Sequence, residues 1–260
     1  MSKKSIRITE ILTSLRNHGE ISVKELARKL MASEMTIRRD LNFLEEEDIV
    51  KRIHGGAILN NSYLINTDIR YLFGEEIEKS IEQKNLIGLA SAQLINDGDT
   101  IGFDIGTTTP FIAKNLKKDI HITAVCTTFE CAEDLYAKKN VNLLVTGGVL
   151  HRESDVFRSD EGLQLLKSVR MDKTFISAGG IDTDLGLTCY HNYHIEIKKH
   201  LMESSKQIIL VSDSSKFGHV KPSFFANISA IDILITDSGI QENYRELLEE
   251  LEIELIIADK

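Results

Sequence analysis

The sequence of 260 residues has no apolar run long enough to cross a lipid bilayer, and its first ten residues, MSKKSIRITE, are polar and charged. We therefore expect a cytoplasmic protein without a membrane span or a secretory leader. Internal repeats and low-complexity tracts are missing as well. Hydrophobic residues make up 42% and charged residues 27%, which is typical of a globular protein, and the length favours two folded units.

Cysteine is scarce, and Cys126, Cys131 and Cys189 are far apart with no Cys-x-x-Cys arrangement. An odd number of scattered cysteines argues against both a disulfide framework and a thiolate metal site. We expect reduced thiols that are mostly buried.

A metal site and a cofactor are not expected either. His191 and His194 are three residues apart and lie near Glu196, but no third ligand at a convincing spacing accompanies them. Partly exposed histidines on the face of a helix are the more common interpretation of this pattern.

Charge is distributed unevenly along the chain, whose formal net charge is −9. Residues 1–60 carry 11 Lys and Arg against 9 Asp and Glu, a balance of +2, and the other 200 residues carry 20 against 31, a balance of −11. An acidic protein with a weakly basic amino-terminal part is consistent with two units that bind different partners.

Two short helices are predicted near the amino terminus. Apolar residues at helical spacing indicate a first helix from Ile6 to Leu15, and Gly19 is suited to end it. Ser22 and Glu25 have the spacing of a capping box, which would open a second helix that runs through Leu30.

A third helix and a hairpin follow. Ser33 can cap the third helix, in which Ile37, Leu41 and Leu44 fall on one face. Residues 49–53 and 57–59 are prone to form strands, and His54-Gly55-Gly56 is a turn signal between them. Three helices and a hairpin in this order predict a winged helix-turn-helix over residues 1–60.

The exposed side of the third helix carries side chains suited to DNA. Arginine can donate two hydrogen bonds to guanine in the major groove, and cations on the wing neutralise phosphates. The candidate DNA-binding residues are Ser33, Thr36, Arg38, Arg39, Asn42, Lys51, Arg52 and His54. The alternative is an ordinary solvated helix face, in which the two arginines pair with Glu34, Asp40 or Glu45.

The rest of the chain alternates between short apolar runs and helical patterns, which predicts a mostly parallel, Rossmann-like α/β sheet covered by helices. Residues 61–74 are the expected linker, and a helix from about Glu75 to Ile95 opens the second domain, 75–260. The predicted strands are Thr100–Phe103, Ile120–Val125, Val141–Val145, Thr174–Ile176, Ile208–Val211, Ile231–Ile235 and Glu254–Ile257.

A phosphate subsite is predicted after the first of these strands. Gly106 and the hydroxyls of Thr107, Thr108 and Thr109 precede Pro110, which suits the first turn of a helix. Free amides at a helix start favour an anion, while Asp104 would accept hydrogen bonds from sugar hydroxyls. The alternative is a simple tight turn with threonines that cap the helix.

Three more loops follow predicted strands, where the ligands of parallel α/β sheets are found. They are Gly147-Gly148, Gly179 to Asp182, and Asp213 to Gly218. Lys216 is expected to pair with a phosphate, while Asp182 or Asp213 would accept hydroxyl protons or hold Lys216 in place.

The segments SEMTIRRDLNFLE and VKRIHGGA resemble the amino-terminal signature of the DeoR family of bacterial sugar-metabolism repressors. Residues from about Gln83 to Thr236 resemble its sensor domain, which is similar in fold to sugar-phosphate isomerases. The resemblance implies a phosphorylated sugar as effector and adds Lys198 to the candidate effector-binding residues. One departure is Cys126-Thr127, where the family frequently has Thr-Asn. The stretches FDIGTTTPFI, ITAVC and GLTCY are most similar to members that control deoxyribonucleoside operons and respond to deoxyribose 5-phosphate.

A repressor of this kind is expected to bind double-stranded operator DNA as a homodimer or a higher oligomer. The competing hypothesis is a sugar-phosphate isomerase that uses Glu196 or Asp182 as a base. We favour the regulator, with no catalytic residues, because an isomerase has no evident use for a winged helix.

Overall fold

The computed structural model describes residues 7–8, 10–11, 14–15, 20–46, 50–53, 55–59, 79–152 and 154–259. The chain divides into two compact units, Met1–Leu72 and Phe73–Lys260. The predicted features that lie outside the described residues include the linker at 61–74, the start of the helix expected from about Glu75, the helix end near Gly19, and His54. Among the described helices, none combines the length and the apolar character needed to span a membrane.

The first unit contains the predicted helices and hairpin, together with a third strand that the sequence pattern did not predict. Residues 7–8, 10–11 and 14–15 are helical. The strand order is β1-β3-β2, with both pairs antiparallel. The further elements are β1 (Glu20–Ser22), α2 (Val23–Lys29), α3 (Glu34–Glu46), β2 (Val50–Ile53) and β3 (Gly56–Leu59).

Local hydrogen bonds explain where these elements begin. Ser22 Oγ accepts a bond from the Glu25 amide at 3.2 Å and the Ser22 amide donates to the Glu25 carboxylate at 3.1 Å, so the predicted capping box is confirmed. Gly56 lies so close to strand β1 that a Cβ atom there would overlap the carbonyl oxygen of Ile21. A glycine is therefore needed where the hairpin meets β1.

The second unit is built on a seven-stranded parallel sheet in the order β15-β14-β12-β9-β4-β5-β6. All seven predicted strands are present, with ends that differ by no more than three residues. They are β4 (Thr100–Phe103), β5 (Ile122–Cys126), β6 (Val141–Val145), β9 (Met171–Ile176), β12 (Ser205–Val211), β14 (Ile233–Thr236) and β15 (Glu254–Ile257).

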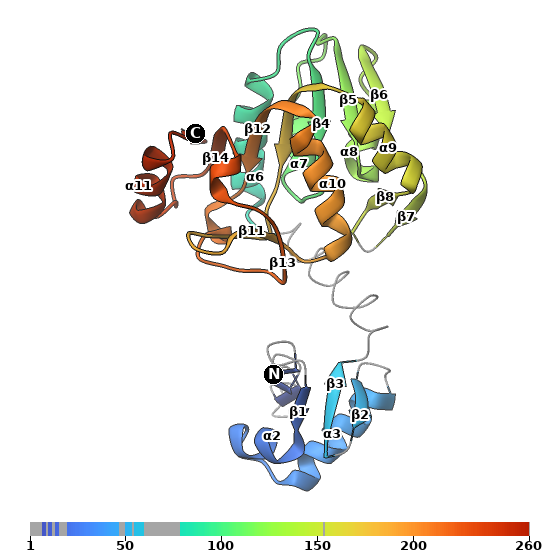
Figure 1. Cartoon of the computed structure of the whole chain (residues 1–260), viewed down its shortest axis with the longest axis vertical. Coiled ribbons are helices and arrows are strands. Elements are labelled where there is room, and N and C mark those ends of the chain that lie inside the picture. The colour runs from blue at the N-terminus through green and yellow to red at the C-terminus, as the bar shows by residue number, and fades with distance from the viewer. Residues whose placement is uncertain are drawn as a thin grey trace. The chain divides into compact units, whose positions relative to one another are not determined.

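Helices cover both faces of this sheet (Figure 1). One face packs against α6 (Ile81–Gln93), α7 (Thr109–Asn115) and α8 (Phe129–Tyr136), through residues such as Ile87, Ile112 and Leu135. The other face packs against α9 (Asp160–Ser168) and α10 (Asn192–Glu203), through Leu166, Ile197 and Leu201. Helix α11 (Glu242–Glu250) packs beside the β14–β15 end.

Two small antiparallel sheets were not predicted. Strands β7 (Val149–His151) and β8 (Val156–Arg158) form a hairpin between β6 and α9. Strands β10 (Gly180–Asp182), β11 (Gly186–Cys189) and β13 (Ser223–Ala226) form a three-stranded sheet. Both lie in segments that leave the carboxyl ends of the main strands, so they add polar loops to that edge of the sheet.

Candidate functional sites

Helix α3 has one buried face and one exposed face. Ile37, Leu41 and Leu44 are almost completely buried in the core of the first unit. Arg38, Arg39 and Asn42 are exposed on the other side, as predicted. Ser33 and Thr36 form the start of the helix, because the Thr36 amide donates to Ser33 Oγ at 3.2 Å and the two hydroxyls are 2.9 Å apart.

The alternative interpretation, in which the two arginines pair with Glu34, Asp40 or Glu45, holds only in part. Arg38 lies 3.8 Å from Glu34, and both side chains are about half exposed, so this pair is weak and can exchange for a phosphate or base. Asp40 is buried and pairs with Arg7 from the first helix. Asp40 therefore fixes the first helix against α3 and does not neutralise the exposed arginines.

The wing is tied to α3 by its own polar residues. The Arg52 guanidinium donates to Asn42 Oδ1 at 2.5 Å, and the Arg52 amide donates to the Glu45 carboxylate at 3.1 Å. Lys51 is exposed on β2. These contacts give Asn42 and Arg52 a role in holding the wing against the helix, and they leave Lys51, Arg38 and Arg39 as exposed cations.

In the second unit, a buried ion pair joins two strands to α10. Asp104 directly follows β4, and its Oδ2 accepts hydrogen bonds from the Ser177 amide at 3.0 Å and from Lys198 Nζ. Lys198 also donates to the carbonyl oxygens of Ser177 at 2.9 Å and Ile105 at 3.4 Å. An ammonium group has three donors, so Lys198 has none left for a ligand and acts as a positioning residue.

The loop after β4 forms a tight turn, as in the alternative to the phosphate subsite, but the side chain of the N-cap residue Thr108 makes no capping hydrogen bond. A Cβ atom at Gly106 would overlap the hydroxyl of Ser177, so only glycine fits this close approach. Thr109 Oγ1 donates to the Asp104 carbonyl at 2.8 Å and the Gly106 carbonyl at 3.2 Å, which uses that hydroxyl within the loop. Gly106 and Thr107 are partly exposed, whereas Thr108 is buried, so Gly106 and Thr107 form the accessible part of the turn.

The other candidate residues lie in neighbouring loops and have local hydrogen bonds of their own. Asp182 Oδ1 accepts bonds from the amides of Asp184 at 3.0 Å and Leu185 at 2.9 Å, and so shapes the turn after β10. Asp213, which follows β12, accepts bonds from the amide and hydroxyl of Ser215. Lys216 lies in the same short 3-10 turn.

Gly147 and Gly148 follow β6, two strands away from β4, with φ angles of +66° and +93°. The structure therefore brings Asp104, Gly106, Thr109 and Lys198 together. It places the remaining candidates in loops along the same edge of the sheet.

The β7–β8 hairpin is fixed to the loop that connects β5 and α8. The Phe157 amide donates to the Thr127 carbonyl at 2.9 Å, and Asp155 accepts bonds from the amides of Phe129 at 3.0 Å and Glu130 at 2.6 Å. Burial raises the pKa of the Asp155 carboxyl group. Because the Asp155 backbone carbonyl binds the Phe129 amide and the Asp155 carboxylate binds the Glu130 amide, the first two amides of α8 are not open to an external anion.

An aromatic and histidine cluster connects the same hairpin to the first turn of α10. Tyr193 stacks against His151 at 5.6 Å and against His191 at 5.0 Å between ring centroids, and its hydroxyl lies 3.1 Å from Ser154 Oγ. The Arg158 guanidinium lies 5.6 Å from the centre of the Tyr193 ring. The hairpin and the helix therefore meet through side chains of which the sequence analysis considered only His191.

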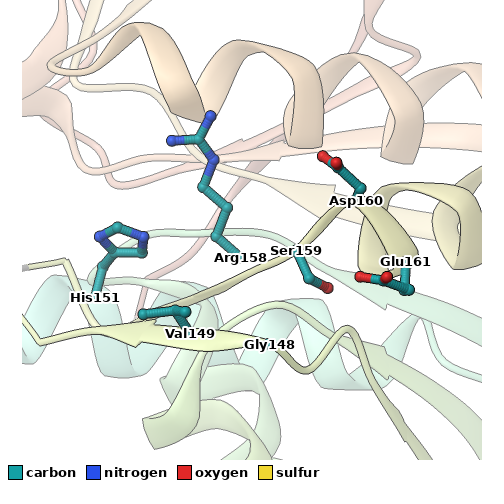
Figure 2. Close-up of a pocket in the computed structure, with 7 residues that line it drawn as sticks. All are labelled: Gly148, Val149, His151, Arg158, Ser159, Asp160 and Glu161. Atoms are coloured by element: carbon teal, nitrogen blue, oxygen red, sulfur yellow. The ribbon is translucent and has the colours of Figure 1, made fainter.

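A shallow open hollow of about 470 Å³ lies against this hairpin. Figure 2 shows His151 and Arg158 rising from the two strands, while Asp160 and Glu161 stand at the start of α9. The hollow thus has a cationic side toward α10 and an acidic side toward α9.

His194 is the clearest difference from the expected histidine pair. It is only 6% exposed, whereas a partly exposed helix face was predicted, and that prediction is wrong for this residue. Burial lowers the pKa of His194 well below its usual value and that of His191 to about 4. Within the described ranges, no three His, Cys, Asp or Glu side chains are grouped to bind a metal, and Glu196 is exposed.

Several buried polar atoms at this edge have no hydrogen-bond partner. Among the described residues there are seven such side-chain atoms, and six of them lie at the carboxyl ends of strands or on the first turns of α10. The six are Asp104 Oδ1, Thr128 Oγ1, Thr146 Oγ1, His194 Nε2, Ser212 Oγ and Thr236 Oγ1. Buried polar groups are normally satisfied, so their concentration at one edge is typical of a place where a polar ligand or water binds.

Polar residues such as Ser177, Thr128 and Thr146 were missed, although each follows a predicted strand within one to three residues. Their position shortly after a predicted strand is the feature by which sequence analysis could have identified them. His151, Arg158 and Tyr193 gave no such signal, because their positions depend on the unpredicted hairpin.

A winged helix with exposed arginines, in a chain that also carries a parallel α/β unit with an unsatisfied polar edge, defines a DNA-binding regulator with a ligand-sensing domain. Family models agree. A DeoR-like helix-turn-helix domain matches residues 7–63, and a DeoR C terminal sensor domain matches residues 79–238. The chain belongs to the DeoR family of DNA-binding transcriptional regulators of sugar metabolism, which are not enzymes.

Individual relatives are similar over nearly their whole length. The chain is 31% identical to the HTH-type transcriptional repressor GlcR of Bacillus subtilis (strain 168), covering 98% of this chain and 96% of that protein. It is 28% identical to the deoxyribose operon repressor of Escherichia coli (strain K12), covering 98% and 99%. These two values are close, so similarity alone does not select one sugar.

Among solved structures, ribose 5-phosphate isomerase A from Methanocaldococcus jannaschii matches 54% of this chain and 55% of its own, with 16% identity and a TM-score of 0.41. A match at this level carries no argument. The sensor fold rests on the family match and on the parallel sheet itself.

Loss of the Lys198 ammonium is expected to destabilise the second unit strongly. In Lys198→Met the Asp104 carboxylate stays buried without its counter-ion, and breaking a buried pair in this way costs about 3–5 kcal/mol. Urea unfolding measures the loss. The double variant Asp104→Leu/Lys198→Met removes both charges and should recover much of it.

Lys206→Met is the matched control, because Lys206 is 78% exposed and pairs with Asp172 at the surface. It should leave the unfolding midpoint nearly unchanged. Similar, small losses for Lys198→Met and Lys206→Met would contradict the structural role assigned to Lys198.

Proposed function

We propose that this protein is a cytoplasmic repressor of a carbohydrate or deoxyribonucleoside catabolic operon, and that a phosphorylated sugar releases it from operator DNA. The single observation that carries the sensor half of this proposal is the unsatisfied polar edge around Asp104. A sugar offers several hydroxyl groups that can satisfy such atoms. The Gly106–Thr108 turn offers backbone amides and hydroxyls to a phosphate.

Deoxyribose 5-phosphate is the first effector to test. The stretches FDIGTTTPFI and GLTCY support this choice, since they resemble the regulators of deoxyribonucleoside operons, and the deoxyribose operon repressor is one of the similar proteins. Thr127, which stands in place of the family's frequent asparagine, donates its hydroxyl to the Phe103 carbonyl at 3.2 Å. The neighbouring Thr128 hydroxyl is buried and has no hydrogen-bond partner among the described residues.

We infer that the protein acts as a homodimer or a higher oligomer. One winged helix contacts few base pairs, and paired helices that bind symmetric half-sites give the needed specificity. The effector releases DNA only if it binds the DNA-free arrangement more tightly than the DNA-bound one.

Arg38→Ala should weaken specific DNA binding without unfolding the protein. An arginine that contacts a guanine contributes about 1–3 kcal/mol of discrimination, so the preference for the selected site over random DNA should fall by about 5- to 150-fold. Fluorescence anisotropy with duplexes selected from a random library measures both affinities. Arg245→Ala, on the surface of α11, is the control and should bind like the wild type. Unchanged specificity in Arg38→Ala would remove Arg38 from the recognition surface.

Phosphorylated sugars should raise the melting temperature of the wild-type protein. A ligand selective for the folded state adds about 2.7 kcal/mol at a hundredfold excess over its Kd. Thr107→Ala and Lys216→Ala should bind DNA normally but respond less to deoxyribose 5-phosphate in thermal shift and in release of labelled DNA. A full response in both variants would exclude the proposed phosphate site.

A further inference from the structure

His194 is a buried polar side chain that has no role in the DNA binding and phosphate binding proposed above. It lies on α10 one turn before Lys198, on the same buried face of the helix. Its ring packs edge-on against Tyr193 at 4.5 Å and against His191 at 5.0 Å between centroids. Its Nε2 is buried and has no hydrogen-bond partner among the described residues.

The charge state of His194 is set by its surroundings. Burial, together with the nearby Lys198 cation, lowers its pKa well below the usual value, so the imidazole is neutral near pH 7. A neutral imidazole has one donor and one acceptor nitrogen. Asp104 Oδ1 is buried and unpartnered in the same way, and Lys198, one helical turn from His194, binds the other oxygen of that carboxylate.

We propose that His194 and Asp104 form a subsite for uncharged hydroxyl groups of the effector, and that His194 is the specificity-determining residue there. This inference rests on the proposed sugar-phosphate function. A hydroxyl group can donate to a carboxylate and can also bond to a neutral imidazole, so the several hydroxyl groups of a sugar match the chemistry of both atoms. A phosphate group would face the Asp104 carboxylate, and Lys198 has no free donor to offset that repulsion. The phosphate therefore binds away from this pair.

A ligand-binding role and a structural role predict opposite effects of an apolar replacement. If Nε2 lacks a partner in the ligand-free protein, His194→Phe keeps an aromatic ring against Tyr193 and removes the unsatisfied atom, so the melting temperature should rise. If His194 is needed for packing or hydrogen bonding in the fold, the melting temperature should fall. His194→Leu is a second apolar variant in case phenylalanine does not fit.

The experiment measures the melting temperature of full-length wild type, His194→Phe and His194→Leu, alone and with deoxyribose 5-phosphate, ribose 5-phosphate or inorganic phosphate. We expect an apolar variant that is more stable without ligand, with an apparent Kd for the sugar phosphates weakened about tenfold, the effect of one lost hydrogen bond. The response to inorganic phosphate should not change. His200→Phe is the matched control, because His200 lies on the same helix and pairs with Glu203 at 3.4 Å.

Two results overturn the inference in different ways. Apolar variants that respond to sugar phosphates as strongly as the wild type contradict the subsite alone, as do variants that are less stable than the wild type and keep the response. A wild-type protein that responds to none of the sugar phosphates contradicts the proposed function and this inference with it.

An independent observation concerns Met35 in the first unit. Met35 is 68% exposed on α3, and it precedes Arg38, Arg39 and Asn42 by three, four and seven residues, so the four side chains share one stripe of the helix. The opposite face alone supplies α3's part of the core, through Ile37, Leu41 and Leu44. A large apolar side chain thus stands among exposed cations near the start of the helix.

We infer that Met35 contacts the methyl group of a thymine in the operator. The thymine methyl is the apolar feature of the major groove, and the first residues of a recognition helix contact base edges. Methionine is flexible and packs well against irregular apolar surfaces. The positive charges of Arg38 and Arg39 attract the phosphate backbone of DNA, so this stripe is suited to a DNA partner.

Uracil, which lacks only the thymine methyl, provides the test. Each thymine of a half-site selected from a random duplex library is replaced by uracil, and binding by wild type and Met35→Ala is compared. One replacement should weaken wild-type binding about fourfold, the effect of one buried methyl group, and should not affect Met35→Ala. Met31→Ala, a control at a methionine that is 94% exposed before the helix, should keep the wild-type sensitivity. Equal losses in wild type and Met35→Ala at every thymine would overturn the contact.

Discussion

The buried ion pair between Lys198 and Asp104 is the interaction on which the second unit depends. It connects α10 to the ends of β4 and β9, because Lys198 also binds the carbonyls of Ile105 and Ser177. Two charges removed from water are stable only when their hydrogen bonds are satisfied, and here the ammonium is fully satisfied. The carboxylate keeps one buried oxygen without a hydrogen-bond partner, and that oxygen is one of the unsatisfied polar atoms at this edge of the sheet.

The two units use charge in opposite ways. In the first unit, Asp40 is neutralised by Arg7 inside the fold, and Arg38, Arg39 and Lys51 remain exposed. In the second unit the central cation, Lys198, is enclosed and bonded to Asp104 and to two backbone carbonyls. Burial therefore decides whether a cation stays exposed to a partner or is used within the fold.

The sequence was sufficient to predict features that depend on local patterns. Strand and helix alternation predicted all seven strands of the parallel sheet, and the capping box at Ser22 predicted the start of α2. The β7–β8 hairpin could not be predicted this way, since each strand has three residues and its position depends on contacts with Thr127 and Tyr193 far away in the sequence. The loop motif indicated Asp104 as a candidate ligand-binding residue. It did not indicate that the carboxylates of Asp182 and Asp213 would accept hydrogen bonds within their own turns.

The β7–β8 hairpin contacts two segments at the edge of the sheet where the unsatisfied polar atoms lie: the end of the β5–α8 connection and the start of α10. It is held on one side by the Thr127 carbonyl and the first two amides of α8, and on the other by Tyr193 at the start of α10. Thr128 and His194, each with an unsatisfied atom, are next to these two attachment points. A ligand that bonds to both would strengthen the contacts on the two sides of the hairpin at once. Binding energy can then change the stability of this segment, because the ligand-free edge leaves these atoms without partners.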